Sequence, residues 1–172
     1  MTVLTAYNAD GNVSAVTAVN SSTGNQVTQF VYGTTLSSSG IASSLLKSAE
    51  VYPDSVGGSD QVTFTYNRQG EPTTVTDQNG TVHAYDYDGL GRRTQDCVTA
   101  LGTGIDAAVL RIGTTYEVRG MAAQVTSYDN ARGVRHGLQS HRQSVVILPS
   151  RVLLPVLPEF VQDGGRAEVV GS

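Results

Sequence analysis

The chain has 172 residues, a formal net charge of -4 and only 15% charged residues, so it has no broad basic surface for a nucleic-acid backbone. No uninterrupted apolar run reaches the roughly 20 residues of a membrane-spanning helix, because prolines and charged residues break the most apolar stretch, near 145–157. Tryptophan is absent, and the richness in Thr, Ser, Val, Gly and Asn favours strands and turns over helices.

The first residues carry neither the positive segment nor the apolar segment of a secretory signal. If the chain is the complete product, we therefore expect it in the cytoplasm. Cys97 is the only cysteine, which excludes an intrachain disulfide and a cysteine-based zinc cluster.

A short pattern recurs along residues 7–120. It is a tyrosine followed four positions later by a glycine, and its copies are Tyr7/Gly11, Tyr66/Gly70, Tyr87/Gly91 and Tyr116/Gly120. Three copies have a Val-Thr pair nine and ten positions after the tyrosine, at 16–17, 75–76 and 125–126. This repetition predicts a series of β-hairpins, with each glycine at a turn position of strained backbone.

The strand signals begin at Val27 to Tyr32, where apolar and polar side chains alternate. Residues 36–60 interrupt the rhythm and form a predicted insertion, with loops at 37–40 and 57–59. Leu45 to Tyr52 has the length of a strand or a short helix, and we expect a strand that ends at Pro53. Alternation returns in Val62 to Tyr66, which predicts a half-buried antiparallel strand.

The strongest local signal is a hairpin over residues 74–85. Two strand-like runs flank Asn79 and Gly80, and both residue types accept a positive φ. An Asn-Gly pair between strands predicts a two-residue turn of type I′, whose twist matches the strands.

Residues 132–172 differ from the rest of the chain. The repeat marks stop, three prolines cluster between Pro149 and Pro158, and His136 and His141 occur among several arginines. This irregular tail is either a Pro-rich closing segment or a segment whose reading frame is altered.

The sequence offers little for catalysis or metal binding. Asp86 and Asp88 start like a calcium loop, but Cys97 stands where such a loop needs a glutamate. Arg92 and Arg93 are expected to pair with strand carboxylates such as Asp86 or Asp96 and not to clamp a phosphate. We therefore predict no metal, no cofactor and no enzymatic activity.

Two residue pairs resemble a catalytic or a metal-binding pair, and neither has the spacing that this chemistry needs. Cys97 beside His83 has no spacing typical of a nucleophile and its base. His136 and His141 are five apart, which misses the spacing of two ligands on one helix face.

Tyrosines are the most abundant functional resource. The rings of Tyr85 and Tyr87 are suited to stacking on sugar faces, with the carboxylates of Asp86 and Asp88 beside them to bond hydroxyls. The alternative, which we favour for each tyrosine, is that the rings pack one hairpin on the next.

One segment carries a family resemblance. Residues 85–94, Tyr-Asp-Tyr-Asp-Gly-Leu-Gly-Arg-Arg-Thr, resemble the core of the YD, or RHS, repeat, with Tyr87, Gly91 and Arg92 at its turn. The segments that begin at Tyr7, Tyr66 and Tyr116 look like degenerate copies, so the resemblance covers roughly residues 7–130. It implies a large bacterial surface or secreted protein whose hairpins spiral into a hollow shell, which sometimes encloses a toxin and is credited with carbohydrate binding.

Together these observations predict an all-β chain of consecutive, incomplete antiparallel hairpins over residues 1–131, followed by the tail. The expected role is that of a structural or adhesive segment of a larger extracellular or surface protein. Its expected partners are further repeats of the parent chain or a neighbouring protein. The alternatives are a carbohydrate-binding module and a nonfunctional remnant of a toxin-delivery shell.

Overall fold

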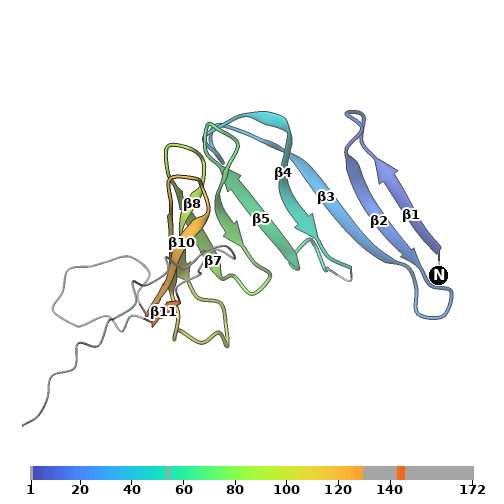
Figure 1. Cartoon of the computed structure of the whole chain (residues 1–172). Coiled ribbons are helices and arrows are strands. Elements are labelled where there is room, and N and C mark those ends of the chain that lie inside the picture. The colour runs from blue at the N-terminus through green and yellow to red at the C-terminus, as the bar shows by residue number, and fades with distance from the viewer. Residues whose placement is uncertain (1, 54, 130–142, 146–172) are drawn as a thin grey trace, which may run out of the picture.

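The computed structural model describes residues 2–53, 55–129 and 143–145. These residues form one sheet of eleven strands, in which each strand pairs antiparallel with the strand that precedes it in the chain (Figure 1). Along these residues there is no helix, and so none long and apolar enough to cross a membrane. The predicted all-β architecture of consecutive hairpins is confirmed.

The strands cover most of the described residues. They are β1 (Thr2–Tyr7), β2 (Val13–Val19), β3 (Gln26–Thr34), β4 (Ser43–Val51), β5 (Gln61–Tyr66), β6 (Pro72–Thr76), β7 (Val82–Tyr87), β8 (Arg93–Ala100), β9 (Arg111–Tyr116), β10 (Ala122–Tyr128) and β11 (Gln143–Val145). In Figure 1, β1 to β5 spread side by side, while β7, β8 and β10 turn away from them, so the sheet curls toward its C-terminal strands.

The predicted insertion at 36–60 contributes a full member of the sheet. β4 lies between β3 and β5 and ends just before Pro53, so the expected strand at Leu45 to Tyr52 is confirmed. The loop before β4 folds back on β5, where the Gly40 amide donates to the carbonyl of Tyr66 at 2.6 Å. The predicted tail, 132–172, lies outside the described residues apart from β11.

Five of the turns have one hydrogen-bond pattern. In the turn after β6, the Asp77 amide donates to the Thr81 carbonyl at 2.9 Å, and the Gly80 amide donates to the Asp77 carbonyl at 3.1 Å. The same two bonds close the turns that start at Asn8, Asn67, Asp88 and Glu117. Each turn places a glycine with a positive φ in its fourth position: Gly11, Gly70, Gly80, Gly91 and Gly120.

The predicted type I′ turn at Asn79-Gly80 is therefore wrong. The loop holds three residues, which form a turn of the common type followed by one glycine in the left-handed region. The side chain of Asp77 selects this form, because its Oδ1 accepts the amides of Asn79 at 2.9 Å and Thr81 at 2.8 Å. The Asn-Gly hairpin and the Tyr-x-x-x-Gly turns thus have one construction.

The sheet is a single layer, and its apolar core is small. Among the described residues the only buried apolar side chains are Ala49, Tyr66 and Cys97. One face is bridged instead by Lys47, whose ammonium lies 5.3 Å from the ring centre of Phe30 and 4.9 Å from that of Phe64. Its charge is paired with Glu50 at 2.6 Å. Cross-strand contacts of this kind replace the second layer that most sheets pack against.

Neighbouring Tyr-x-x-x-Gly turns pack against one another along one edge of the sheet. A methyl group added at Gly91 would collide with the Glu71 carboxylate of the preceding turn. Arg92 has the same relation to the following turn, since its guanidinium lies 3.8 Å from the position of a methyl group on Gly120. In these two cases the residue after a turn glycine reaches the glycine of the next Tyr-x-x-x-Gly turn.

Replacing Gly91 by alanine is expected to lower the free energy of unfolding by about 1 to 2 kcal/mol, because the methyl group strains a positive φ and displaces the carboxylate of Glu71, the end of a flexible side chain. Gly80→Ala is the matched control, since its φ is +83° against +76° for Gly91 and nothing lies within 4 Å of the added methyl group. The control should cost about 1 kcal/mol. Urea unfolding followed by circular dichroism measures both, and equal losses would show that the turns are not packed together.

Candidate functional site

In three of the four Tyr-x-x-x-Gly turns, the first residue caps the turn with its side chain. Oδ1 of Asp88 accepts the amides of Leu90 at 2.9 Å and Arg92 at 3.0 Å. Asn8 and Asn67 accept the equivalent pairs of amides in their own turns. The Asp or Asn that follows the repeat tyrosine is therefore a structural acceptor in these three turns. Glu117, in the weakest copy, makes no such bonds.

The repeat tyrosines join each hairpin to the strand before it. The hydroxyl of Tyr87, at the end of β7, donates to the backbone carbonyl of Pro72 on β6 at 2.7 Å. Tyr116, at the end of β9, donates in the same way to Arg93 on β8 at 2.7 Å. In both cases the acceptor is the second residue after the glycine of the preceding Tyr-x-x-x-Gly turn: Pro72 follows Gly70, and Arg93 follows Gly91. We call this contact the tyrosine bridge.

Tyr66 makes the third tyrosine bridge with a different acceptor. Its hydroxyl donates to the carbonyl of Lys47 on β4 at 2.6 Å, because the loop before β4 replaces the usual turn. Tyr66 is 8% exposed, and burial raises the pKa of its phenol. A phenol that stays protonated remains a donor, so the environment supports the bridge.

Tyr7 is the exception among the four repeat tyrosines. It ends β1, the first strand of the sheet order, so no described strand precedes it. Its side chain is 65% exposed, and its hydroxyl bonds to no other described residue. All six residues of β1 are exposed. Tyr7 therefore has the donor of a tyrosine bridge without the acceptor.

The arginines near the best-preserved turn have structural partners. Nε and a terminal nitrogen of Arg92 each lie 2.7 Å from Oδ2 of Asp88, and this hydrogen bond is the main reason that the pKa of Asp88 is lowered. Arg93 lies over the Tyr85 ring at 4.9 Å from its centre. The partner of Arg92 is the turn residue Asp88, so the expected pairing of this arginine with Asp86 or Asp96 was wrong.

The four residues proposed for sugar binding, Tyr85 to Asp88, do lie together. They line one side of a hollow of about 320 Å³, opposite residues of the preceding turn such as Asn67 and Glu71. Tyr87 and Asp88 are engaged in the bridge and in the turn. The hydroxyl of Tyr85 bonds to no described residue, and its pKa is raised by burial and then by the charge of Asp96.

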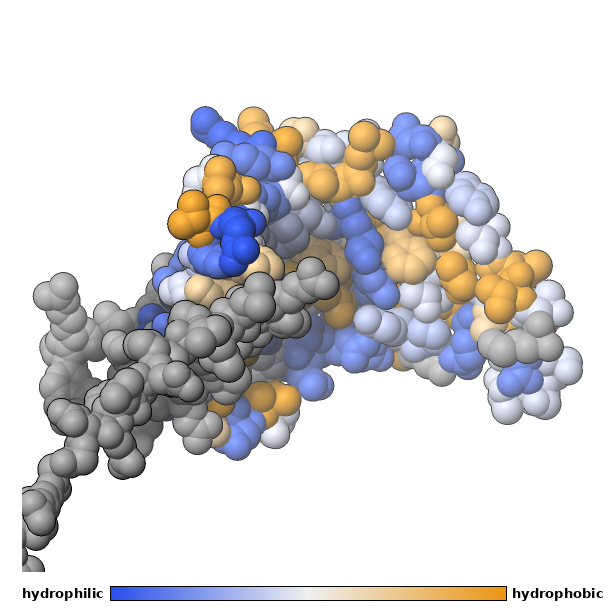
Figure 2. All heavy atoms as spheres, in the orientation of Figure 1, coloured by the Kyte–Doolittle hydropathy of each residue, from blue (hydrophilic) through white to orange (hydrophobic). Residues whose placement is uncertain are grey.

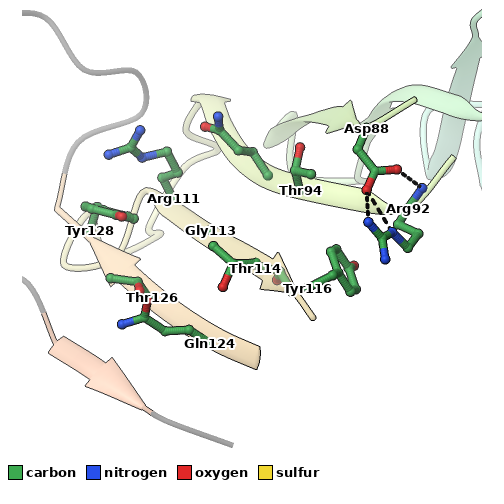
Figure 3. Close-up of a pocket in the computed structure, with 12 residues that line it drawn as sticks. Asp88, Arg92, Thr94, Arg111, Gly113, Thr114, Tyr116, Gln124, Thr126 and Tyr128 are labelled. Atoms are coloured by element: carbon green, nitrogen blue, oxygen red, sulfur yellow. Dashed lines mark hydrogen bonds and ion pairs between the residues drawn. The ribbon is translucent and has the colours of Figure 1, made fainter. Parts of the chain in front are cut away.

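A second hollow, of about 410 Å³, lies across β8, β9 and β10 and was not predicted (Figure 3). Figure 3 shows Arg92 beside Tyr116 at one end and Arg111 beside Tyr128 at the other, with threonines and Gln124 between them. The two guanidinium groups lie 4.5 Å and 3.8 Å from the centres of their tyrosine rings. No spacing in the sequence indicates this arrangement, because it depends on which strands pair.

The geometry separates the residues that were weighed for catalysis. His83 pairs with Val98, and its neighbour Ala84 pairs with Cys97, so His83 and Cys97 lie on opposite faces of the sheet. Cys97 is fully buried, and His83 lies 2.7 Å from an oxygen of Asp96. His136 and His141 lie outside the described residues. Within the described ranges, no group of three His, Cys, Asp or Glu side chains is arranged to hold a metal.

The comparison with known families agrees with this geometry. Residues 59–103 match the family model described as RHS Repeat, and this segment runs from the start of β5 past the end of β8. This segment is similar to an RHS repeat. The matched segment includes two tyrosine-bridge donors, Tyr66 and Tyr87, and three of the five similar turns. No curated protein matches the chain.

The tyrosines of the Tyr-x-x-x-Gly turns are expected to differ in their contribution to the free energy of unfolding. Tyr87→Phe and Tyr116→Phe each remove a hydroxyl that bonds a backbone carbonyl, so each should lower the free energy of unfolding by about 1 kcal/mol. Tyr7→Phe is the matched control and should have no effect, because its exposed hydroxyl has no partner. Urea titrations of the three variants test this, and a loss in Tyr7→Phe equal to the others would contradict the bridge.

Proposed function

We propose that the chain is a non-catalytic structural segment of a longer RHS-type array, located outside the cell or on its surface. The observation that carries the proposal is the tyrosine bridge. It recurs at successive hairpins, and its donor is present without an acceptor on the first strand, β1. A contact that repeats at three successive junctions, β4–β5, β6–β7 and β8–β9, and stays open at the edge is typical of proteins whose units are stabilised by their neighbours.

The other end of the sheet supports the same role. Ala122 starts β10 and pairs with Tyr116, as Pro72 pairs with Tyr66 and Arg93 pairs with Tyr87. It is also the second residue after its turn glycine, which is the position of the bridge acceptors Pro72 and Arg93. The segment therefore presents a donor at one edge and the backbone position of an acceptor at the other, as a middle piece of an array requires.

A tandem chain tests this role. The tandem protein consists of residues 2–128, then a linker, then a whole second chain. The linker has the sequence of 101–110, the loop that connects β8 to β9, and here it connects β10 of the first copy to β1 of the second. If the segment is built to continue an array, the two copies should unfold as one cooperative unit, at a higher midpoint than the single chain. Differential scanning calorimetry reports this.

The control tandem carries Tyr7→Phe in its second copy only, which removes the bridge at the new junction and leaves all the others. It should lose part of the gain in midpoint. Two copies that unfold independently, at the midpoint of the single chain, would refute the structural proposal.

Carbohydrate binding is a second candidate, and the hollow beside Tyr85 favours it. Glu71, Tyr85 and Asp88 are among the residues that line the hollow. Carboxylates accept bonds from sugar hydroxyls, and an aromatic ring provides an apolar surface for the sugar face.

Tyr85→Ala is the informative change for this second candidate, because Tyr87→Ala would also remove a tyrosine bridge. If the hollow binds glycans, a glycan array should show binding by the whole chain and its loss in Tyr85→Ala. The exposed Tyr7→Ala serves as the control and should keep binding. An array without signal for the unaltered chain would remove this candidate.

A further inference from the structure

The β6–β7 and β8–β9 junctions have the same strand register. At the β6–β7 junction, the third to fifth residues before Tyr87 pair with Thr74, Val75 and Thr76. At the β8–β9 junction, the third to fifth residues before Tyr116 pair with Gln95, Asp96 and Cys97. In both cases the partners are the fourth to sixth residues after the glycine of the preceding Tyr-x-x-x-Gly turn, which is Gly70 for β6 and Gly91 for β8. Which residues pair at a junction therefore follows from two sequence offsets. One is the number of residues before the tyrosine on the later strand, and the other is the number of residues after the glycine that precedes the earlier strand.

Applied to the two edge strands, this register is complementary. The third to fifth residues before Tyr7 are Leu4, Val3 and Thr2, and the fourth to sixth residues after Gly120 are Gln124, Val125 and Thr126. We propose that two copies of this chain associate head to tail, with β1 of one copy on the outer edge of β10 of the other. Leu4 then lies opposite Gln124, Val3 opposite Val125 and Thr2 opposite Thr126, and the Tyr7 hydroxyl donates to the Ala122 carbonyl.

The side chains of the two strands are compatible with this pairing. Val3 and Leu4 are 53% and 57% exposed, and Figure 2 shows apolar atoms at the surface at this end of the sheet. Neither β1 nor β10 carries a charged residue, so the contact brings no like charges together. Edge strands that avoid pairing usually carry charged residues, a proline or a bulge, and β1 has no charge and no proline. Its register shift lies between Ala6 and Tyr7, and β7, which pairs on both edges, has the same shift between Asp86 and Tyr87.

β11 competes for the same edge. It pairs with Val125, Thr126 and Ser127 through Val145, Ser144 and Gln143. The strand has three residues and contains no tyrosine, so it forms no tyrosine bridge to Ala122. We infer that β11 caps the chain against a second copy, and that weakening β11 promotes association.

The association rests on the same tyrosine bridge as the proposed structural role. The contact is heterologous, because β1 of one copy meets β10 of another and not a second β1. Each addition therefore leaves one β1 edge and one β10 edge unpaired in the assembly. Addition of further copies is therefore expected, and a closed dimer is not.

Sedimentation velocity of the whole chain over a range of concentrations tests the proposal. The unaltered chain should show a mass that rises with concentration, and the double variant Ser144→Pro/Val145→Pro should associate more strongly. Successive amides of a strand point to opposite sides, so one of the two prolines removes an amide that faces β10. Adding Tyr7→Phe to the double variant should weaken association about five-fold, through the loss of one hydrogen bond.

Tyr32→Phe is the control, because the Tyr32 hydroxyl lies within the sheet on β3 and takes no part in the junction. It should leave association unchanged. Monomers at every concentration in the double variant would overturn the proposal, as would association that Tyr7→Phe and Leu4→Lys both leave intact. If separate chains stay monomeric while the tandem chain unfolds as one unit, the self-association fails and the structural role stands.

Discussion

A sheet of one layer has to hold its hairpins together with contacts made inside that layer. Burial contributes little here, because only Ala49, Tyr66 and Cys97 are buried apolar residues in the part of the chain that the structure describes. The tyrosine bridge adds a side-chain connection to the backbone ladder, since it joins neighbouring strands through a backbone carbonyl that every residue offers. The acceptor does not depend on a side chain, so the contact survives wide variation in the neighbouring strand.

In the best-preserved Tyr-x-x-x-Gly copy, the residues that define the pattern make separate contacts. In the copy at Tyr87, the tyrosine bridges to the preceding strand, Asp88 accepts two amides of its own turn, and Gly91 supplies the positive φ. Arg92 pairs with Asp88 and reaches the next turn at Gly120. A single turn is thereby coupled to the hairpin before it and the hairpin after it, which explains why its residues recur together at fixed spacing.

The sequence predicted what depends on local spacing and missed what depends on strand pairing. Alternating residues located β3 and β5 to within a few positions, and the repeated glycines located the turns. The type I′ turn at Asn79-Gly80 was wrong because the pair was considered without Asp77, whose carboxylate sets the form of the loop. The bridge acceptors could not be predicted, because they are backbone carbonyls 15 to 23 residues away in the chain. The partner of Arg92 was missed because strand carboxylates were considered and the turn residue Asp88 was not.

The tyrosine bridge also gives the sheet a direction. Its donor always lies on the later strand of a junction and its acceptor on the earlier strand, so the two edges of the sheet are never equivalent. An array built this way extends by adding an acceptor edge before β1 or a donor edge after β10, and two β1 edges cannot form the same contact. In such a sheet, a short strand without a tyrosine, such as β11, fills the acceptor edge without completing the junction. Whether the array continues is therefore set by where the next tyrosine stands relative to the turn glycine before it, and not by the apolar content of the strands.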